Sequence, residues 1–345
     1  MKRARELVPG LFRVRLPLPF PLRSVNAYVV RGDDGFTVID AGLRSPEAEA
    51  AWSEAMREIG MTDADVVRIV LTHHHPDHLG MTGVLQERSR APVYLSAEGA
   101  AQARLLWGPG SPMTEALLEL FARHGMDAGT LADMRVHLDG FAAQVSPLPE
   151  FTELRSGEFV PIGDGGFRAI ATPGHAAGHF AFYEAFEAAP TDSADGGTAG
   201  TGGVLFCGDL VLEKITPNVG FLPGFDDDPL GSFLKSLEAL GTLSVRIAYP
   251  GHGEPFSSFG ARTSAIIEHH RRRLAAIEAM LAEPMSAYAV CRRLFGDRLT
   301  IHQLRFAMAE TLAHLVYLER RGRLVAQERG GVVAFEAAVS RSRVS

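Results

Sequence analysis

The sequence predicts an α/β layered domain followed by a smaller helical domain that ends in a β-hairpin. Three observations support this. Short apolar runs rich in β-branched residues alternate with helical stretches over residues 1–260. From residue 261 the pattern changes to three stretches of helical periodicity. A glycine turn between two apolar runs then follows, and three helices with a hairpin are the layout of a winged helix.

The predicted strands of the first unit are short and bounded by polar or glycine-rich residues. They cover residues 26–32, 34–42, 66–75, 91–96, 167–175, 179–186, 204–212 and 245–253. Helices are predicted between them over 46–60 and 228–241, where apolar residues recur at helical spacing. The second of these helices opens with Asp228 as N-cap and Pro229 at the first helical position.

Two segments interrupt this alternation. Residues 105–150 are predicted to be largely helical, with prolines at the edges, and are expected to cap the rim of the sheets. Residues 188–203 are small, polar and glycine-rich, which predicts a flexible, disordered hairpin tip. The second domain, 261–345, is predicted to hold helices over 262–283, 286–296 and 300–322. A hairpin over 323–337 turns at Gly330-Gly331.

Composition excludes several classes of protein. The 345 residues are 46% hydrophobic and 22% charged, as in an ordinary globular protein. Two cysteines, Cys207 and Cys291, are too few for a disulfide framework or a thiolate metal cluster, and each is expected to pack as a small hydrophobe. Arginines and prolines break the apolar part of the N-terminal segment, and no run approaches the roughly 18 apolar residues of a membrane span. A cytoplasmic protein without a membrane partner is expected.

Charge is distributed unevenly along the chain. Residues 1–260 hold 20 Lys and Arg against 33 Asp and Glu, whereas residues 261–345 hold 14 against 8. An acidic body with a basic tail raises the question of an anionic partner. The simpler explanation is a solvated arginine face or a contact between the two domains.

The segment LTHHHPDHLG at 71–80 carries four histidines and an aspartate within six positions. In an extended or tightly turned segment, His73 and His75 project to the same side and His74 points away. Asp77 and His78 follow in the turn, where Pro76 discourages a helix from starting earlier. This pattern offers two imidazoles to one metal ion and a carboxylate with an imidazole to another, and these are ligands that zinc favours.

Further ligands must come from elsewhere, and three polar motifs follow predicted strands. His175 lies in ATPGHAAGH, Asp209 in FCGDL and His252 in YPGHGEP. One ion would then take His73, His75 and His175, and the other Asp77, His78 and His252, with Asp209 bridging the two. Glycines flank these ligands and are expected to let the backbone turn sharply at Gly174, Gly208, Gly251 and Gly253. Side chains at the ends of several strands can meet at one rim of the sheets.

With these motifs the sequence resembles the metallo-β-lactamase superfamily. The resemblance covers about residues 10–260 and rests on THHHPDH at 72–78, PGH at 173–175, GD at 208–209 and GHG at 251–253. It implies an αββα sandwich with a two-metal site at the edge of its sheets. It also implies that Asp40, in VIDAG, supports the metal-binding loop without binding metal itself. The C-terminal unit is similar to the winged-helix extension of one hydrolase subgroup.

The resemblance also implies a mechanism. Two divalent ions about 3.5–4 Å apart lower the pKa of a shared water and give a bridging hydroxide that attacks the substrate. Asp77 and Asp209 would act as catalytic residues that orient the water or accept its proton. Zinc is the metal expected, with iron and manganese as alternatives.

The bond that is cut is less firmly implied than the chemistry. Asp209 disfavours β-lactam hydrolysis, because the drug-cleaving branches generally lack this carboxylate. A small carboxylic ester, thioester or lactone is the expected substrate, since the helical insertion would close over it. A ribonuclease or phosphodiesterase acting on RNA is the alternative, supported by the basic tail. A mononuclear-iron persulfide dioxygenase and a nucleic-acid-binding regulator are further alternatives, and a homodimer stays open.

Overall fold

The first sheet has seven strands, in the order of the chain, in a computed structural model that describes residues 2–108, 110, 113–185 and 202–338. Its strands are β1 Ala4–Val8, β2 Leu11–Pro17, β3 Ser24–Gly32, β4 Gly35–Ile39, β5 Val66–Val70, β6 Val93–Leu95 and β7 Phe151–Glu153. Neighbours from β1 to β4 are antiparallel, and those from β4 to β7 are parallel. The parallel half follows from the helical crossovers that join its strands.

The second sheet has five strands in the order β12-β11-β10-β9-β8. They are β8 Phe159–Ile162, β9 Gly165–Ala171, β10 Phe180–Glu184, β11 Gly203–Gly208 and β12 Val245–Pro250. Strands β9 and β11 are both antiparallel to β10, and β12 is parallel to β11. The chain therefore leaves β9, β11 and β12 at the same edge of the sheet.

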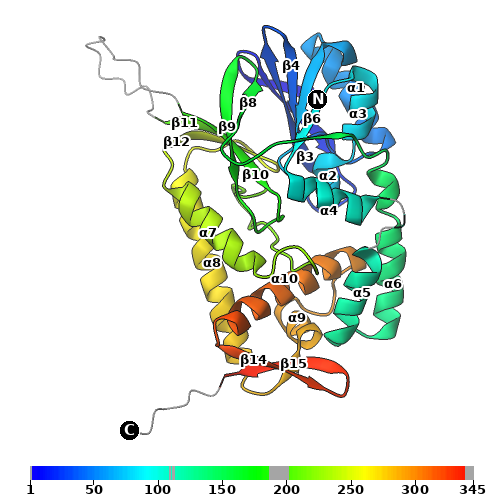
Figure 1. Ribbon diagram of the computed structural model, residues 1–345, viewed down its shortest axis with the longest axis vertical. Helices are drawn as coiled ribbons and strands as arrows, with labels where there is room; N and C mark the ends of the chain where they lie inside the picture. The colour runs from blue at the N-terminus through cyan, green and yellow to red at the C-terminus, as the bar shows by residue number, and fades with distance from the viewer. Residues whose placement is uncertain (1, 109, 111–112, 186–201, 339–345) are drawn as a thin grey trace, which may run out of the picture.

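The two sheets lie face to face, with helices on both outer sides (Figure 1). One apolar core between the sheets joins residues of the first, such as Tyr28 and Val70, to residues of the second, such as Phe182 and Phe206. A second core packs the first sheet against α1 (Pro46–Ile59), α3 (Thr82–Ser89) and α4 (Ala97–Trp107). The opposite face of the second sheet packs against α7 (Pro229–Gly241) and α8 (Phe259–Met280). These layers are the expected α/β fold.

Helix ends follow from local sequence. The Ser45 side chain accepts a hydrogen bond from the Ala48 amide at the start of α1, and Gly60 ends that helix at φ 78°. Asp228 caps α7 in the same way: its side chain accepts from the Gly231 amide, and Pro229 is the first residue of the helix. The predicted cap of this helix is confirmed.

Four further helices fill the space below the sandwich in Figure 1. Helices α5 (Met113–Arg123) and α6 (Ala128–Asp139) occupy the segment predicted to be helical. Helices α9 (Ala287–Phe295) and α10 (Ile301–Arg320) follow α8, and a small sheet has the order β13-β15-β14. Its strands are β13 Met285–Ser286, β14 Leu324–Arg329 and β15 Val332–Ala337. All these helices share the apolar core of α7 and α8.

The predicted secondary structure agrees best with the observed structure in the apolar strands. Every strand predicted in the first unit and the hairpin around Gly330-Gly331 are present, and both cysteines are buried. Strands β1, β2, β7, β8 and β13 were not predicted. The segment 188–203 lies almost wholly outside the described residues, and the domain boundary after residue 260 stays a prediction. Within the described part of the chain, no helix has the length and apolar character needed to cross a bilayer.

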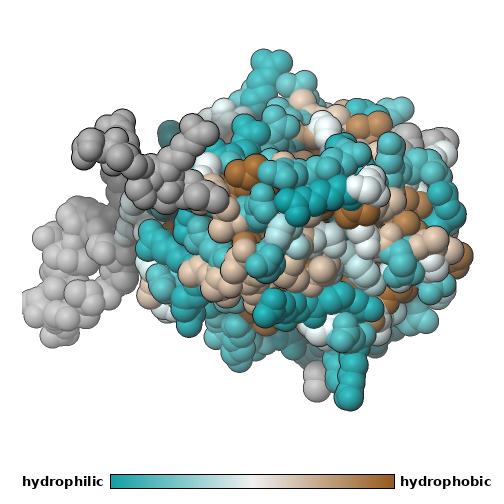
Figure 2. Space-filling model, turned by 90° about the horizontal axis from the view of Figure 1, so that it is seen from below, coloured by the Kyte–Doolittle hydropathy of each residue, from teal (hydrophilic) through white to brown (hydrophobic). Residues whose placement is uncertain are grey.

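The end of the molecule that Figure 1 shows at the bottom has a mixed surface (Figure 2). Hydrophilic side chains cover most of this face, and hydrophobic residues lie between them near its centre. Scattered apolar side chains of this kind are normal on a folded domain.

Candidate metal centre

The predicted ligands lie where strands end at one rim of the two sheets. His73 and His75 follow β5, and the short helix α2 (Pro76–Leu79) presents Asp77 and His78 one turn later. The other three ligands come from the second sheet, after β9, β11 and β12 respectively: His175, Asp209 and His252. The structure therefore brings all seven predicted side chains together.

Three histidines form one half of the centre. The Nε2 atom of His73 lies 3.0 Å from Nδ1 of His75 and 3.3 Å from Nε2 of His175. These three nitrogens form a group compact enough to hold one ion. His74, which the sequence places on the other side of the segment, belongs to none of the compact ligand groups in the described residues.

The other half contains two carboxylates. The Nε2 atom of His252 lies 3.2 Å from Asp77 Oδ2 and 3.4 Å from Asp209 Oδ2. The Nε2 atom of His78 lies 3.5 Å from Asp209 Oδ1. Asp77, His78 and His252 form a second compact group, and His73, His78 and Asp209 form a third. Asp209 also faces His175, with Oδ2 3.7 Å from Nε2, so this carboxylate lies between the two halves.

Asp40 fixes the segment that carries the histidines. Its Oδ1 accepts from the Thr72 amide (2.8 Å) and its Oδ2 from the Thr72 hydroxyl (2.9 Å). Oδ2 also lies 2.8 Å from Nδ1 of His78. Asp40 sits directly after β4 at φ 56°, a left-handed conformation that Asp tolerates better than most residues. The structure thus places Asp40 behind the ligands and not among them.

Two further histidines are oriented by backbone carbonyls. Nδ1 of His175 donates to the Asn218 carbonyl (2.7 Å), and Nδ1 of His252 donates to the Ser24 carbonyl (2.9 Å). A proton on Nδ1 leaves the lone pair on Nε2, which points into the centre. Hydrogen bonds outside the cluster therefore set the tautomer that binds a metal.

The residues fit a pair of divalent ions. Two nitrogens on one tetrahedral zinc, each at about 2.0–2.1 Å, lie about 3.3 Å apart, close to the observed spacing of the His73, His75 and His175 nitrogens. In the other half, His78 Nε2, Asp209 Oδ1 and His252 Nε2 are buried and have no hydrogen-bond partner in the described structure. Buried polar atoms without partners are costly, and a bound cation would satisfy them.

Protonation also differs between the halves. Burial, followed by the nearby His78, lowers the pKa of His73 well below its usual range, so this imidazole keeps a free lone pair. Burial also opposes a charge on His252, but Asp209 and Asp77 outweigh it and raise the pKa of that group to about 10. Without a metal, the carboxylates hold protons on the neighbouring imidazoles. Metal binding here would release protons.

One buried histidine near the centre was missed from the sequence. The Nε2 atom of His179 accepts from the Asp209 amide (3.3 Å), while Nδ1 contacts the Thr172 hydroxyl (2.7 Å). His179 thereby anchors the backbone of a central ligand. The sequence signal that could have identified it is the second histidine of ATPGHAAGH. This residue was predicted only as the first residue of the strand over 179–186.

The glycines next to the ligands have different roles. Gly174 and Gly208 adopt φ 129° and 48°, as the predicted sharp turns require. Gly251 does not need a left-handed conformation. A Cβ on Gly251 would lie 2.3 Å from Asp209 Oδ1 and 2.6 Å from the His78 ring. The two ligands therefore leave no room for a side chain at this position.

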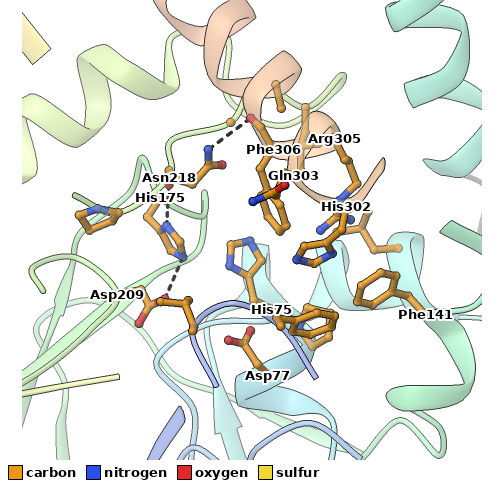
Figure 3. A pocket seen from close by; sticks show the side chains of 18 of the residues that line it. His75, Asp77, Phe141, His175, Asp209, Asn218, His302, Gln303, Arg305 and Phe306 are labelled. Carbon is orange, nitrogen blue, oxygen red and sulfur yellow. Dashed lines mark hydrogen bonds and ion pairs between the residues drawn. The ribbon is translucent and has the colours of Figure 1, made fainter. Parts of the chain in front are cut away.

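The centre opens into a cavity of about 400 Å³. Its walls are largely apolar and come from the loop between β2 and β3, the α4–α6 segment, the loop after β11 and helix α10 (Figure 3). They include Phe20, Trp107, Leu117, Phe141, Leu222 and Phe306. Helix α10 also contributes His302, Gln303 and Arg305, which Figure 3 shows across the cavity from Asp209.

Comparison with known proteins fits this geometry. A model of the metallo-beta-lactamase superfamily matches residues 20–187 and 188–252. The chain belongs to the metallo-β-lactamase superfamily. A second model, described as the metallo-beta-lactamase-like C-terminal domain, matches residues 274–338.

Several known proteins are similar to most or part of this chain. A probable metallo-hydrolase of Bacillus subtilis, YqjP, is 28% identical over 94% of this chain and 96% of its own length. A crystal structure of a metallo-beta-lactamase family protein from Thermus thermophilus superposes with a TM-score of 0.82 at 35% identity, covering 96% of this chain and 100% of that one. The atrochrysone carboxyl ACP thioesterase of Aspergillus fumigatus is 25% identical over 52% of this chain and 56% of its own. The prediction of a metal-dependent hydrolase of this superfamily is confirmed.

Proposed function

We propose that this superfamily member is a dinuclear zinc hydrolase that cleaves a small carboxylic ester, thioester or lactone. The observation that carries the proposal is the cluster of seven ligand side chains beside an apolar cavity, which five of them line: His75, Asp77, His175, Asp209 and His252. Such a cavity suits a compact, partly apolar substrate. The thioesterase among the relatives supports the same class of bond.

In this proposal, His73, His75 and His175 would hold one ion, and Asp77, His78 and His252 would hold the other, with the Asp209 carboxylate between the two groups. Bound ions would supply a Lewis acid for the substrate carbonyl and lower the pKa of a water. Asp77 or Asp209 would accept the proton that this water gives up. The water oxygen would bond to the acyl carbon, and the bond from that carbon to the ester oxygen or thioester sulfur would break. The proton would pass to the released alkoxide or thiolate, so no serine or cysteine nucleophile is required.

The cavity walls exclude bulk water from the reacting atoms and hold the acyl chain. Apolar side chains dominate the lining, and Arg305 is the positively charged side chain among the residues that form it. A polyanion such as RNA is normally bound by a run of basic groups. The cavity therefore favours a small ester or thioester over a nucleic acid.

We infer that the C-terminal unit is a winged-helix domain that serves as a wall of the active site. Its order of elements is helix, short strand, two helices and a hairpin. Helix α10, the last of the three helices, lines the cavity beside the metal centre. The hairpin of β14 and β15 lies below α10 at the bottom of Figure 1, and none of its residues is among those that line the cavity.

The test combines metal quantification with a panel of esters, thioesters, lactones, phosphodiesters and RNA. Two zinc ions per chain are expected, with hydrolysis of at least one carboxylic substrate. Asp77→Ala and His175→Ala should each remove that activity while the circular-dichroism spectrum is retained. Turnover near the wild-type rate in either variant contradicts the proposal, as does a single bound iron or cleavage of RNA alone.

A further inference from the structure

Arg305 is a charged side chain without a charged partner inside the cavity. Its guanidinium carbon lies 4.3 Å from the ring centroid of Phe306 and 5.2 Å from that of Phe141. Its Nε is enclosed and has no hydrogen-bond partner in the described part of the chain. Figure 3 shows it on α10, beside His302 and above the metal centre. The two rings hold the guanidinium in place through cation–π contacts.

Burial of this group is unfavourable. It lowers the pKa of Arg305 to about 10, and the Asp77 carboxylate partly offsets the effect, so the side chain is still charged at neutral pH. Cation–π contacts recover only part of the free energy that removal from water costs. Several other arginines of the C-terminal unit have carboxylate partners, as Arg273 has in Glu310 and Arg321 in Asp228. Arg305 keeps its N–H groups available instead.

Its neighbours on α10 do not supply the missing anion. Burial, with Arg305 and His137 nearby, lowers the pKa of His302 to about 4, so that ring is neutral at physiological pH. Its Nδ1 lies 3.3 Å from Nε2 of His137. The Gln303 side chain accepts from the Thr300 amide and hydroxyl as part of a capping box. A bound ligand is therefore the remaining source of an anion.

We propose that Arg305 binds an anionic group of the substrate. The substrate class is an acyl ester or thioester whose apolar body lies along the cavity and whose other end carries a carboxylate or phosphate that reaches α10. This proposal rests on the hydrolase function given above and specifies its substrate. A guanidinium offers paired N–H donors that match the oxygens of both anions.

The cavity fits this substrate in charge and size. Its two charged regions are the ligand cluster and Arg305, and apolar side chains such as Trp107, Leu117 and Leu222 lie among the other lining residues. A volume of about 400 Å³ admits a small or medium acyl group. Because Arg305 is a single cation in an otherwise apolar wall, it favours a substrate with one anionic group at that end.

The activity test uses a set of thioesters with the same acyl length and the same aryl thiol. The acyl chain ends in a carboxylate, a phosphate or a neutral methyl ester. Wild-type holoenzyme is expected to prefer one of the anionic thioesters over the neutral one by about 10- to 100-fold in kcat/KM. Carboxylate and phosphate are distinguished by which of them is preferred. Arg305→Gln should remove the preference, mainly through a higher KM.

Matched variants separate this role from a general effect of charge. Arg298 is exposed in the loop before α10, so Arg298→Gln changes the net charge equally outside the cavity and should retain the preference. Arg305→Lys keeps the charge but not the paired donors and should retain part of it. An equal ratio of anionic to neutral kcat/KM in wild type and Arg305→Gln overturns the proposal.

A binding measurement decides the case if no thioester is hydrolysed. Calorimetry compares suberic acid monoamide with neutral suberamide in the full-length protein after metal removal, so that a carboxylate cannot bind a metal ion. Binding of the monoamide that is tighter by about tenfold and lost in Arg305→Gln would support the anion site while the hydrolase proposal fails. Equal binding of the two amides overturns the anion site itself, whatever the hydrolysis result.

Discussion

At the scale of single residues, the metal centre depends on hydrogen bonds made on the far side of each ring. His78, His175 and His252 each use Nδ1 for an outer partner: the Asp40 carboxylate, the Asn218 carbonyl and the Ser24 carbonyl, respectively. Each ring is held in one orientation before any ion arrives. Pre-orientation of this kind reduces the entropy lost on binding and raises metal affinity.

Gly251 offers a test of how closely the ligands are packed. Gly251→Ala places a methyl group against Asp209 and His78, which must move apart. We expect metal affinity to fall about 10- to 100-fold, as when a supporting contact of a ligand is removed. Chelator competition on the purified protein measures this change.

Gly253→Ala is the matched control. Gly253 adopts φ 85°, but nothing lies within 4 Å of a Cβ built there. The alanine should therefore cost about 1–2 kcal/mol of folding free energy, seen in urea unfolding, with metal affinity retained. Equal metal affinities for the two variants would show that the space around Gly251 is not critical.

At the scale of elements, the two large sheets could be predicted from the sequence better than the cavity. Ligands at the ends of β5, β9, β11 and β12 could be predicted because apolar runs and polar ends are local patterns. Strands β1 and β2 were missed because charged side chains interrupt their apolar runs, Arg5 and Glu6 in β1 and Arg13 and Arg15 in β2. The cavity residues of α10 carry no local signal. Their role comes from tertiary packing that brings them to side chains more than 100 positions earlier.

Helix α10 is also coupled to the centre through Asn218. The side-chain amide of Asn218 donates to the Glu310 carboxylate (2.8 Å) and to the Phe306 backbone carbonyl (3.3 Å). The backbone carbonyl of Asn218 accepts from His175 and orients that ring. Asn218→Ala should free the loop that presents this carbonyl. We expect about tenfold weaker metal binding.

The control lies on the same helix. Glu319→Gln changes a residue near the far end of α10 and should leave metal affinity unchanged. Urea unfolding of metal-depleted protein shows whether Asn218→Ala merely destabilises the fold. Unchanged affinity in Asn218→Ala would mean that α10 lines the cavity without supporting the ligand.

At the scale of the whole molecule, the basic excess of the C-terminal unit is partly used inside the protein. Arg262 donates to the Leu212 and Ile215 carbonyls (2.7 Å each), and Arg321 pairs with Asp228 at the start of α7. These contacts join the unit to the catalytic layers. They support the simpler explanation of the charge asymmetry, a contact between domains, over a surface for nucleic acid.

The interface between α8 and α10 should make folding stability depend on pH. His270 and His314 are fully buried there, with His270 Nδ1 3.1 Å from His314 Nε2. The Nδ1 of His314 donates to the Glu310 carbonyl (2.8 Å), which leaves Nε2 as the acceptor. Burial lowers their pKa values to about 2 and about 3, and the charge of nearby Arg273 acts in the same direction. His269 also faces the pair.

Because both rings stay neutral in the folded chain but titrate near pH 6.5 when unfolded, their contribution is fully present above about pH 6.5. Below it, the unfolded state binds more protons, so each histidine removes up to about 1.4 kcal/mol of stability per pH unit. His270→Met should therefore show a shallower loss of unfolding free energy than wild type between about pH 6.5 and about pH 5. Urea titrations across this range measure both slopes, and proton uptake by the metal ligands enters both equally. Parallel slopes would mean that the buried pair already takes up a proton in the folded protein.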